Sequence, residues 1–149
     1  MQPVTDHLRL ELTNELGELR RLGAAVAEFA ASAGLSEMRC FDLRLILEEV
    51  AANIIRHAWD GGQHTFAVSL TREPVGVVAF LEDDGRPYNP LDRPPFDPDT
   101  QSERRTAGGL GVYLIRQLTD ELIYERHGDR NQLRLTVRPR PDPQPETDL

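Results

Sequence analysis

The spacing of apolar residues changes period along this 149-residue chain, and this change constrains the fold more than any other feature. Residues 15–33 carry apolar side chains at helical spacing after a predicted cap at Asn14, and Gly34 is expected to end that helix. A second helix is predicted from a Ser36 cap to about residue 59. A third helix is expected over 110–120, and alternating segments typical of strands lie at 7–12, 64–71, 75–82, 121–127 and 131–138.

This order of elements predicts the fold class. Helices followed by strands, with further strands at the far end, are typical of an α+β protein. We expect a two-layer sandwich in which one mixed β-sheet carries about three helices on one face. Residues 7–138 are predicted to form a single domain, and 139–149, with four prolines, to form a disordered tail. Between the strand and helix at 83–108, five prolines and few periodic apolar residues indicate a long loop that closes as a lid.

Composition excludes several classes of function. All 17 basic residues are arginine, so mechanisms that need a lysine, such as a P-loop or a Schiff base, are excluded. The single cysteine, Cys40, rules out disulfides within the chain and metal sites with several cysteines. A net charge of −8 argues against nucleic-acid binding. No apolar run approaches 18 residues and no signal-peptide core is present, so we expect a cytoplasmic protein that does not bind membranes.

One flank of the second helix carries an unusual stripe of polar residues. Glu49, Asn53 and His57 follow each other at four-residue intervals, whereas Glu48 falls on the opposite flank. Asparagine is a poor residue inside a helix, which favours a specific role, although a solvated flank is the simpler interpretation. An amide oxygen suits a hard cation such as Mg²⁺, and a carboxylate one turn earlier can act as a general base.

Two glycine motifs follow. Asp83-Asp84-Gly85 ends a valine-rich strand and is followed by Arg86-Pro87-Tyr88-Asn89-Pro90, which cannot continue as a paired strand. A carboxylate at that position can accept a hydrogen bond from an exocyclic amine, and a glycine lets a flat ring approach the backbone. Gly108-Gly109-Leu110-Gly111 precedes a helix, where free N–H groups and the helix dipole favour an anion, although a flexible hinge is equally compatible with it.

Taken in order, these motifs resemble the boxes of the GHKL ATPases. The stretch Glu48-Glu49-Val50-Ala51-Ala52-Asn53-Ile54-Ile55-Arg56-His57 is similar to their N box. Asp83–Pro90 is similar to the first glycine box, and Gly109-Leu110-Gly111 to the second. The short length looks most like the bacterial anti-sigma-factor serine/threonine kinases of the RsbW type, and the resemblance covers about residues 7–138.

The resemblance implies a Bergerat fold and a set of site residues. Glu49 would be the general base, and Asn53 would carry Mg²⁺ beside ATP. Asp83 would read the adenine amine, Gly85 would let the base approach, and the set of nucleotide-binding residues would be completed by His57, Gly109, Leu110 and Gly111. An arginine from the lid, Arg104 or Arg105, would reach the γ-phosphate, with Arg105 as the catalytic candidate.

The resemblance also implies a function with partners. Such kinases bind Mg-ATP, phosphorylate a serine on a STAS-domain antagonist, release a sigma factor by partner switching, and commonly work as homodimers. Three departures are present: Thr106-Ala107 stands where a basic residue is frequent, Pro87 where many relatives have a glycine, and Asn131 near a usual threonine. The alternatives are an ATP-binding module that sequesters a partner without phosphorylating it, and a sister switch kinase in a larger signalling complex.

Overall fold

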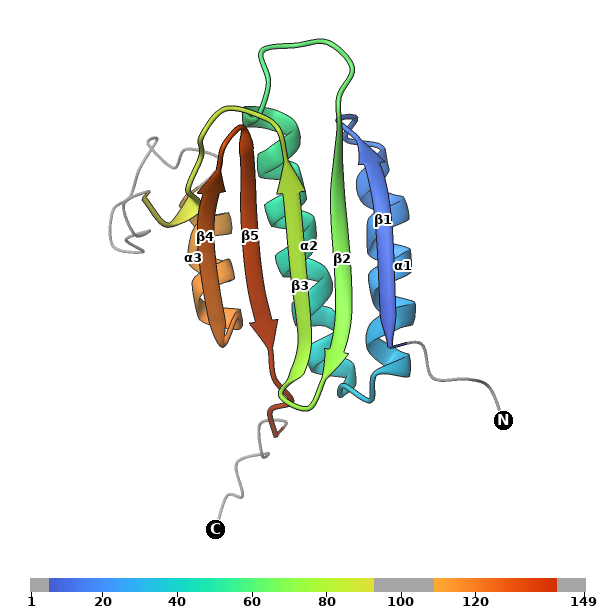
Figure 1. Cartoon of the computed structure of the whole chain (residues 1–149). Coiled ribbons are helices and arrows are strands. Elements are labelled where there is room, and N and C mark those ends of the chain that lie inside the picture. The colour runs from blue at the N-terminus through green and yellow to red at the C-terminus, as the bar shows by residue number, and fades with distance from the viewer. Residues whose placement is uncertain (1–5, 93–108, 142–149) are drawn as a thin grey trace.

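The computed structural model describes residues 6–92 and 109–141. Figure 1 shows the chain order of the elements. These are β1 (His7–Thr13), α1 (Glu18–Ser32), α2 (Glu37–His57), β2 (Thr65–Glu73), β3 (Gly76–Asp83), a short 3-10 helix (Pro90–Asp92), α3 (Gly109–Leu118), β4 (Glu121–His127) and β5 (Arg130–Val137). Each helix and strand predicted within the described residues is present, with ends that differ by at most three residues.

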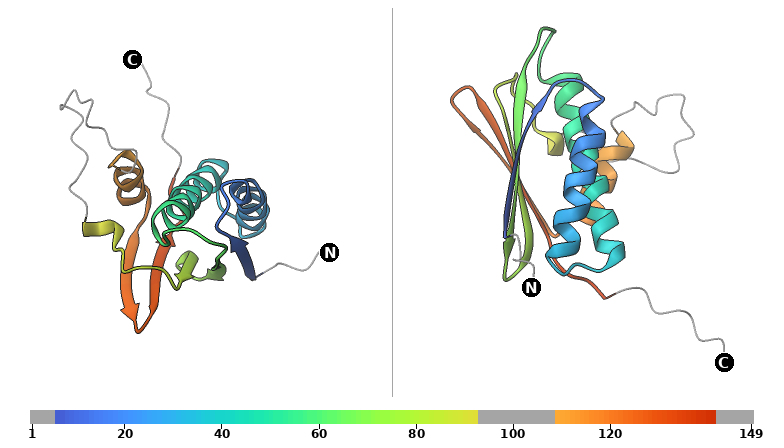
Figure 2. Two further views of the ribbon diagram at one scale, coloured as in Figure 1. Left: turned by 90° about the horizontal axis from the view of Figure 1, so that it is seen from above. Right: turned by 90° about the vertical axis from the view of Figure 1, so that its right-hand side faces the viewer.

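The five strands form one sheet in the order β1-β2-β3-β5-β4, and the three helices cover one of its faces (Figure 2). The predicted two-layer α+β sandwich is therefore confirmed. The sheet itself is not mixed, because every pairing among the described strands is antiparallel. β3 and β4 run in the same direction, but the hairpin from β4 to β5 places β5 between them, so the parallel pair is never adjacent.

The core lies between the helix layer and the inner face of the sheet. Alternating positions of the strands point inward, so Phe66, Val68 and Leu70 of β2 meet the apolar stripes of α1 and α2. The helical part of the core is formed by Leu22, Val26, Phe29, Leu43, Ile46, Leu47 and Val50. This packing sets α2 across the sheet with its polar flank turned toward β3 and α3.

The predicted helix ends are correct in two places and wrong in one. Ser36 caps α2 by accepting a hydrogen bond from the N–H of Arg39 (3.2 Å), and Gly34, with φ of 81°, follows the end of α1. Asn14 does not cap α1, which begins one turn later after Gly17. The Asn14 side chain instead joins the neighbouring loop, donating to the Gly62 carbonyl at 2.9 Å, because the chain turns once before the helix starts.

A buried arginine joins three elements at the end of the sheet far from the polar flank. Arg39 is 2% exposed and pairs with Asp42 and Asp120, both at 2.9 Å. Its guanidinium also donates to the carbonyls of Leu118 (3.0 Å) and Arg138 (2.9 Å). All its hydrogen bonds are charge-assisted, which makes this cluster the main polar connection between α2, the end of α3 and the end of β5.

The beginning of the predicted tail is attached to this cluster. The Arg138 N–H donates to Asp120 at 2.7 Å, and the Arg140 guanidinium binds the other oxygen of Asp120, also at 2.7 Å. The domain boundary predicted at residue 138 therefore lies inside a set of hydrogen bonds that includes residue 140. The rest of the predicted tail, 142–149, lies outside the described residues.

Candidate functional site

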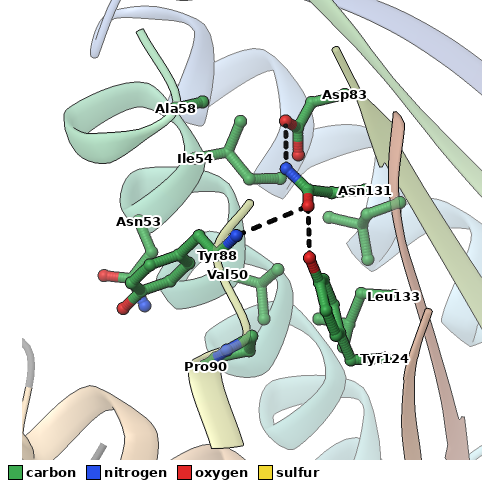
Figure 3. A pocket seen from close by; sticks show the side chains of 11 residues that line it. Val50, Asn53, Ile54, Ala58, Asp83, Tyr88, Pro90, Tyr124, Asn131 and Leu133 are labelled. Carbon is green, nitrogen blue, oxygen red and sulfur yellow. Dashed lines mark hydrogen bonds between the residues drawn. The ribbon is translucent and has the colours of Figure 1, made fainter. Parts of the chain in front are cut away.

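Two of the three motifs, the helix stripe with Asn53 and the turn at Asp83, border a pocket between α2 and the sheet (Figure 3). The second glycine motif is not among its lining residues. Its walls come from α2, from the last residues of β3, from the first residues of β5, from β4 and from the loop that follows β3. The lining residues are Val50, Asn53, Ile54, Ala58, Leu81, Asp83, Tyr88, Pro90, Tyr124, Asn131 and Leu133. Most of this surface is apolar, with a few polar groups in fixed positions, which is the usual character of a small-molecule site.

Asp83 is the buried acid of this pocket. It is the last residue of β3 and is 5% exposed. One carboxylate oxygen, Oδ1, accepts from the N–H of Gly85 (2.8 Å) and from Nδ2 of Asn131 (3.0 Å). Burial raises the pKa of Asp83 above its ordinary value, and these two hydrogen bonds partly offset the rise. Among the described residues none donates to Oδ2, so that oxygen can accept from a ligand.

Gly85 is required by the protein's own packing. A Cβ at this position would lie 2.5 Å from both the Cβ and the carbonyl oxygen of Ala58, at the end of α2. The next residue, Arg86, donates its N–H to the same Ala58 carbonyl at 2.8 Å. The glycine therefore lets the loop close against the helix. The sequence predicted a different reason for this glycine, namely room for a flat base to approach the backbone.

Gly85→Ala is accordingly expected to destabilise the fold. Overpacking against a helix backbone costs about 1–3 kcal/mol. For a chain of this size, that corresponds to a melting temperature lower by roughly 2–12 °C. Gly17→Ala is the control, because nothing lies within 4 Å of a Cβ at Gly17. If thermal unfolding leaves Gly85→Ala unchanged while nucleotide binding weakens, base approach and not packing explains this glycine.

The two adjacent glutamates of α2 point to different neighbours. Glu48 accepts from Arg44 at 2.9 Å and faces α1, where a Cβ at Gly23 would lie 2.4 Å from its carboxylate. Glu49 faces α3, where a Cβ at Gly111 would lie 2.4 Å from its Oε2. Gly111 thus leaves room for the Glu49 carboxylate beside the start of α3. The structure separates the two acids as the helical spacing predicts.

Asn53 lies one turn after Glu49 and lines the pocket. It is 4% exposed, and its amide nitrogen, Nδ2, has no hydrogen-bond partner among the described residues. A buried amide nitrogen without a partner is costly, because its N–H groups have lost contact with water and gained no acceptor. His57, the third residue of the stripe, is not among the lining residues; its ring stacks on Tyr88 with centroids 5.6 Å apart.

Sequence reasoning missed the polar residues that β4 and β5 bring to the pocket. Asn131, noted there only as a departure from a usual threonine, binds Asp83, and Tyr124 donates to its amide oxygen. Arg126 donates to the Gly85 carbonyl at 2.7 Å and supports the same loop. The alternation of β4 places Tyr124 and Arg126 on its inner face, but only the strand order shows which motif they meet.

Some predicted site residues cannot be placed. Arg104 and Arg105 lie outside the described residues, as do residues 93–108 of the lid loop predicted over 83–108. Gly109 and Leu110 begin α3, and the side chain of Leu110 is not described. The roles of all the predicted site residues stay predictions, now with defined positions for Glu49, Asn53, Asp83, Gly85 and Gly111.

Comparison with known proteins identifies the family. The model of the histidine kinase-like ATPase domain matches residues 12–137. The chain belongs to this ATPase domain family. The matched range contains the described helices and strands, apart from the first five residues of β1. The pocket therefore lies in an ATPase domain.

Curated relatives refine the position within the family. The serine/threonine-protein kinase BtrW of Bordetella bronchiseptica is 31% identical over 106 residues, 68% of this chain and 72% of that protein. The serine-protein kinase RsbW of Listeria monocytogenes is 28% identical over 122 residues, 77% and 75% respectively. RsbW of Bacillus subtilis is 25% identical over 91 residues, which is 57% of its length. The predicted resemblance to RsbW-type serine/threonine kinases is confirmed.

A solved structure supports the fold independently. The structure of the RsbU and RsbW domains of a Mycobacterium tuberculosis protein superposes with a TM-score of 0.60 at 19% identity. The match covers 90% of this chain and 32% of that chain. At this identity the match shows the fold alone. No helix within residues 6–92 and 109–141 has the length and apolar character needed to cross a membrane.

Proposed function

We propose that this chain binds Mg-ATP in the pocket at Asp83 and transfers the γ-phosphate to a serine of a partner protein. The observation that carries the proposal is the arrangement along α2. Asp83 lies at one end of the pocket, while Glu49 faces the glycine-rich start of α3, and Asn53 lies between them on the same helix. One helix thereby borders both a base site and a phosphate site.

Adenine recognition follows from the pocket lining. The apolar side chains of Val50, Ile54 and Leu133 would contact the two faces and edge of the ring. The carboxylate of Asp83 would accept a hydrogen bond from the exocyclic amine through Oδ2. Because the acid is buried, this charge-assisted hydrogen bond is stronger than one in water.

Asn53 fits a role as a magnesium ligand. Its amide is buried and borders the pocket, and amide oxygens are among the hard ligands that Mg²⁺ accepts alongside phosphate oxygens and water. The amide nitrogen, which has no partner among the described residues, is a donor and would bind an acceptor such as a phosphate oxygen, not the ion. When bound, the ion would neutralise charge on the phosphates during transfer.

Glu49 is proposed as the general base. Its carboxylate accepts the proton of the serine hydroxyl as the serine oxygen forms a bond to the γ-phosphorus. The bond between that phosphorus and the bridging oxygen breaks, and ADP leaves with the electron pair. The proposal is supported by the position of the Glu49 carboxylate beside Gly111, at the start of α3, because backbone N–H groups at a helix start favour phosphate oxygens nearby.

The partners follow from the type of kinase. We propose a STAS-domain antagonist as the protein that is phosphorylated and a sigma factor as the protein that is released, with the chain acting as a homodimer in the cytoplasm. The names of the curated relatives, serine-protein kinase RsbW and serine/threonine-protein kinase BtrW, support the kinase part of this proposal. The acidic charge of −8 is consistent with protein partners and not with nucleic acid.

Asp83→Asn tests the nucleotide site. The amide oxygen can still accept from Gly85 and Asn131, but the amide nitrogen then points a donor at the adenine amine. Loss of a charge-assisted hydrogen bond is worth about 1.5–3 kcal/mol, or roughly 10- to 150-fold weaker binding of ATP in calorimetric titration. Because burial raises the pKa of Asp83, the ionised acid costs stability at neutral pH, so the variant should not melt at a lower temperature.

Glu82→Gln is the matched control. Glu82 precedes Asp83 on β3, points to the opposite face of the sheet, and pairs with Arg130 and Gln132 at 2.9 Å. The same change from acid to amide should leave its ATP affinity unchanged. Unchanged binding by Asp83→Asn, or an equal loss in both variants, would remove the adenine assignment and with it the proposed function.

A further inference from the structure

Asn131 is placed directly opposite Asp83. The two residues are paired across β3 and β5, although 48 positions separate them in the chain. Asn131 is 5% exposed and is thus as deeply buried as the acid it contacts. Figure 3 shows its amide between Asp83 on one side and Tyr124 on the other.

The hydrogen-bonding capacity of the Asn131 amide is filled by the protein. Nδ2 has two N–H donors, and it donates to Asp83 Oδ1 at 3.0 Å and to the Arg86 carbonyl at 2.8 Å. Oδ1 accepts from the Tyr124 hydroxyl and, at 3.4 Å, from the Tyr88 N–H. No donor or acceptor remains for a base, so any effect of Asn131 on a nucleotide must pass through the groups it binds.

Two of those groups belong to the loop after β3. The Arg86 carbonyl and the Tyr88 N–H are two residues apart, and both are bound by the one amide. Tyr88 and Pro90 of this loop line the pocket. The Asn131 side chain therefore connects the buried acid to the wall of the pocket that the loop supplies.

We propose that Asn131 is a positioning residue for base recognition, which occupies Oδ1 of Asp83 so that Oδ2 faces the exocyclic amine, and which fixes the loop that closes the pocket. The proposal rests on the proposed binding of ATP. A neutral donor suits this role because an arginine at the same place would form an ion pair and compete with the ligand for the carboxylate. The neighbouring cation, Arg126, instead donates to the Gly85 carbonyl.

Preference for ATP over ITP is the readout. Inosine carries a carbonyl where adenine carries the amine, so a correctly aimed carboxylate accepts from ATP and repels ITP. The wild type should bind ATP at least roughly tenfold more tightly than ITP in calorimetric titration. Asn131→Val removes both donors and should lower this preference by roughly tenfold. Asn131→Thr has the same shape as the valine variant and one donor opposite Asp83, so it should retain most of the preference.

Gln132→Val is the control. Gln132 is the next residue of β5, and its side chain binds Glu82 on the opposite face of the sheet at 2.9 Å. Losing an amide there should change the melting temperature at most slightly and leave the ATP-to-ITP ratio as in the wild type. A changed ratio in this variant would mean that general loosening of β5, and not the amide at 131, sets the preference.

The outcomes separate the two proposals. If the wild type binds no ATP, the proposed function fails and this inference fails with it. If the wild type prefers ATP but Asn131→Val keeps that preference, or if the threonine and valine variants lose it equally, the positioning role alone is overturned. Should the valine variant not fold, Asn131→Leu replaces it, since leucine has nearly the shape of asparagine and no donor for Asp83. A retained preference there overturns the inference, and a lost preference supports it.

Discussion

Glu49→Gln is expected to lower the rate of phosphate transfer to the partner serine by roughly 10²–10⁴-fold, the usual contribution of a general base. ATP affinity should be retained, because glutamine has the same shape and the proposed phosphate contacts come from the backbone at the start of α3. The measurement is phosphate incorporation into a co-purifying STAS-type partner, with ATP binding measured by calorimetry on the same preparations. The carboxylate lies against Gly111, on the side of α2 that faces the start of α3.

Glu48→Gln is the matched control for this result. Glu48 is the adjacent acid on the same helix, but it pairs with Arg44 and faces α1. The change should affect neither ATP binding nor phosphate transfer. If Glu48→Gln is the inactive variant, the assignment of the base is wrong by one residue. If the wild type binds ATP and sequesters a sigma factor but transfers no phosphate, the chain is the non-catalytic binding module and not a kinase.

Arg39→Met is expected to cause the largest loss of stability. Removing one partner of a buried ion pair costs about 3–5 kcal/mol because the other charge is left buried. Asp120 would keep its bonds to Arg140 and to the Arg138 N–H, so the lower end, about 3 kcal/mol, is expected. Thermal unfolding should then show a melting temperature lower by roughly 6–12 °C.

Arg44→Met provides the comparison on the same helix. The Arg44 side chain is 52% exposed, and its ion pair with Glu48 at i,i+4 is expected to contribute at most about 0.5 kcal/mol. Its melting temperature should therefore stay close to that of the wild type. Equal small shifts in the two variants would mean that the contacts of Arg39 do not hold α2, α3 and β5 together.

The pattern of apolar residues was sufficient to predict the elements and the separation of Glu48 from Glu49. Helix and strand periods are local properties, so the ends of α2 and the two flanks it presents follow from a stretch of about twenty residues. Asn53 of α2 and Asp83 at the end of β3, which line the pocket, could likewise be named from the sequence, because each motif is contiguous in the chain. The cap of α1 was not, since the turn before Glu18 depends on the contact of Asn14 with a distant loop.

The sequence by itself therefore determined which segments are helices and strands, and which short motifs are candidates for the site. Only the tertiary structure decided that β5 inserts between β3 and β4, that Asn131 meets Asp83 across 48 residues, and that Arg39 meets Asp120 across 81. The physical reason is that the partner of a buried polar group is chosen by strand order and packing, which bring together residues that no local period relates. The sequence marked Asn131 only as a departure from a usual threonine, whereas the structure shows it bonded to a buried carboxylate.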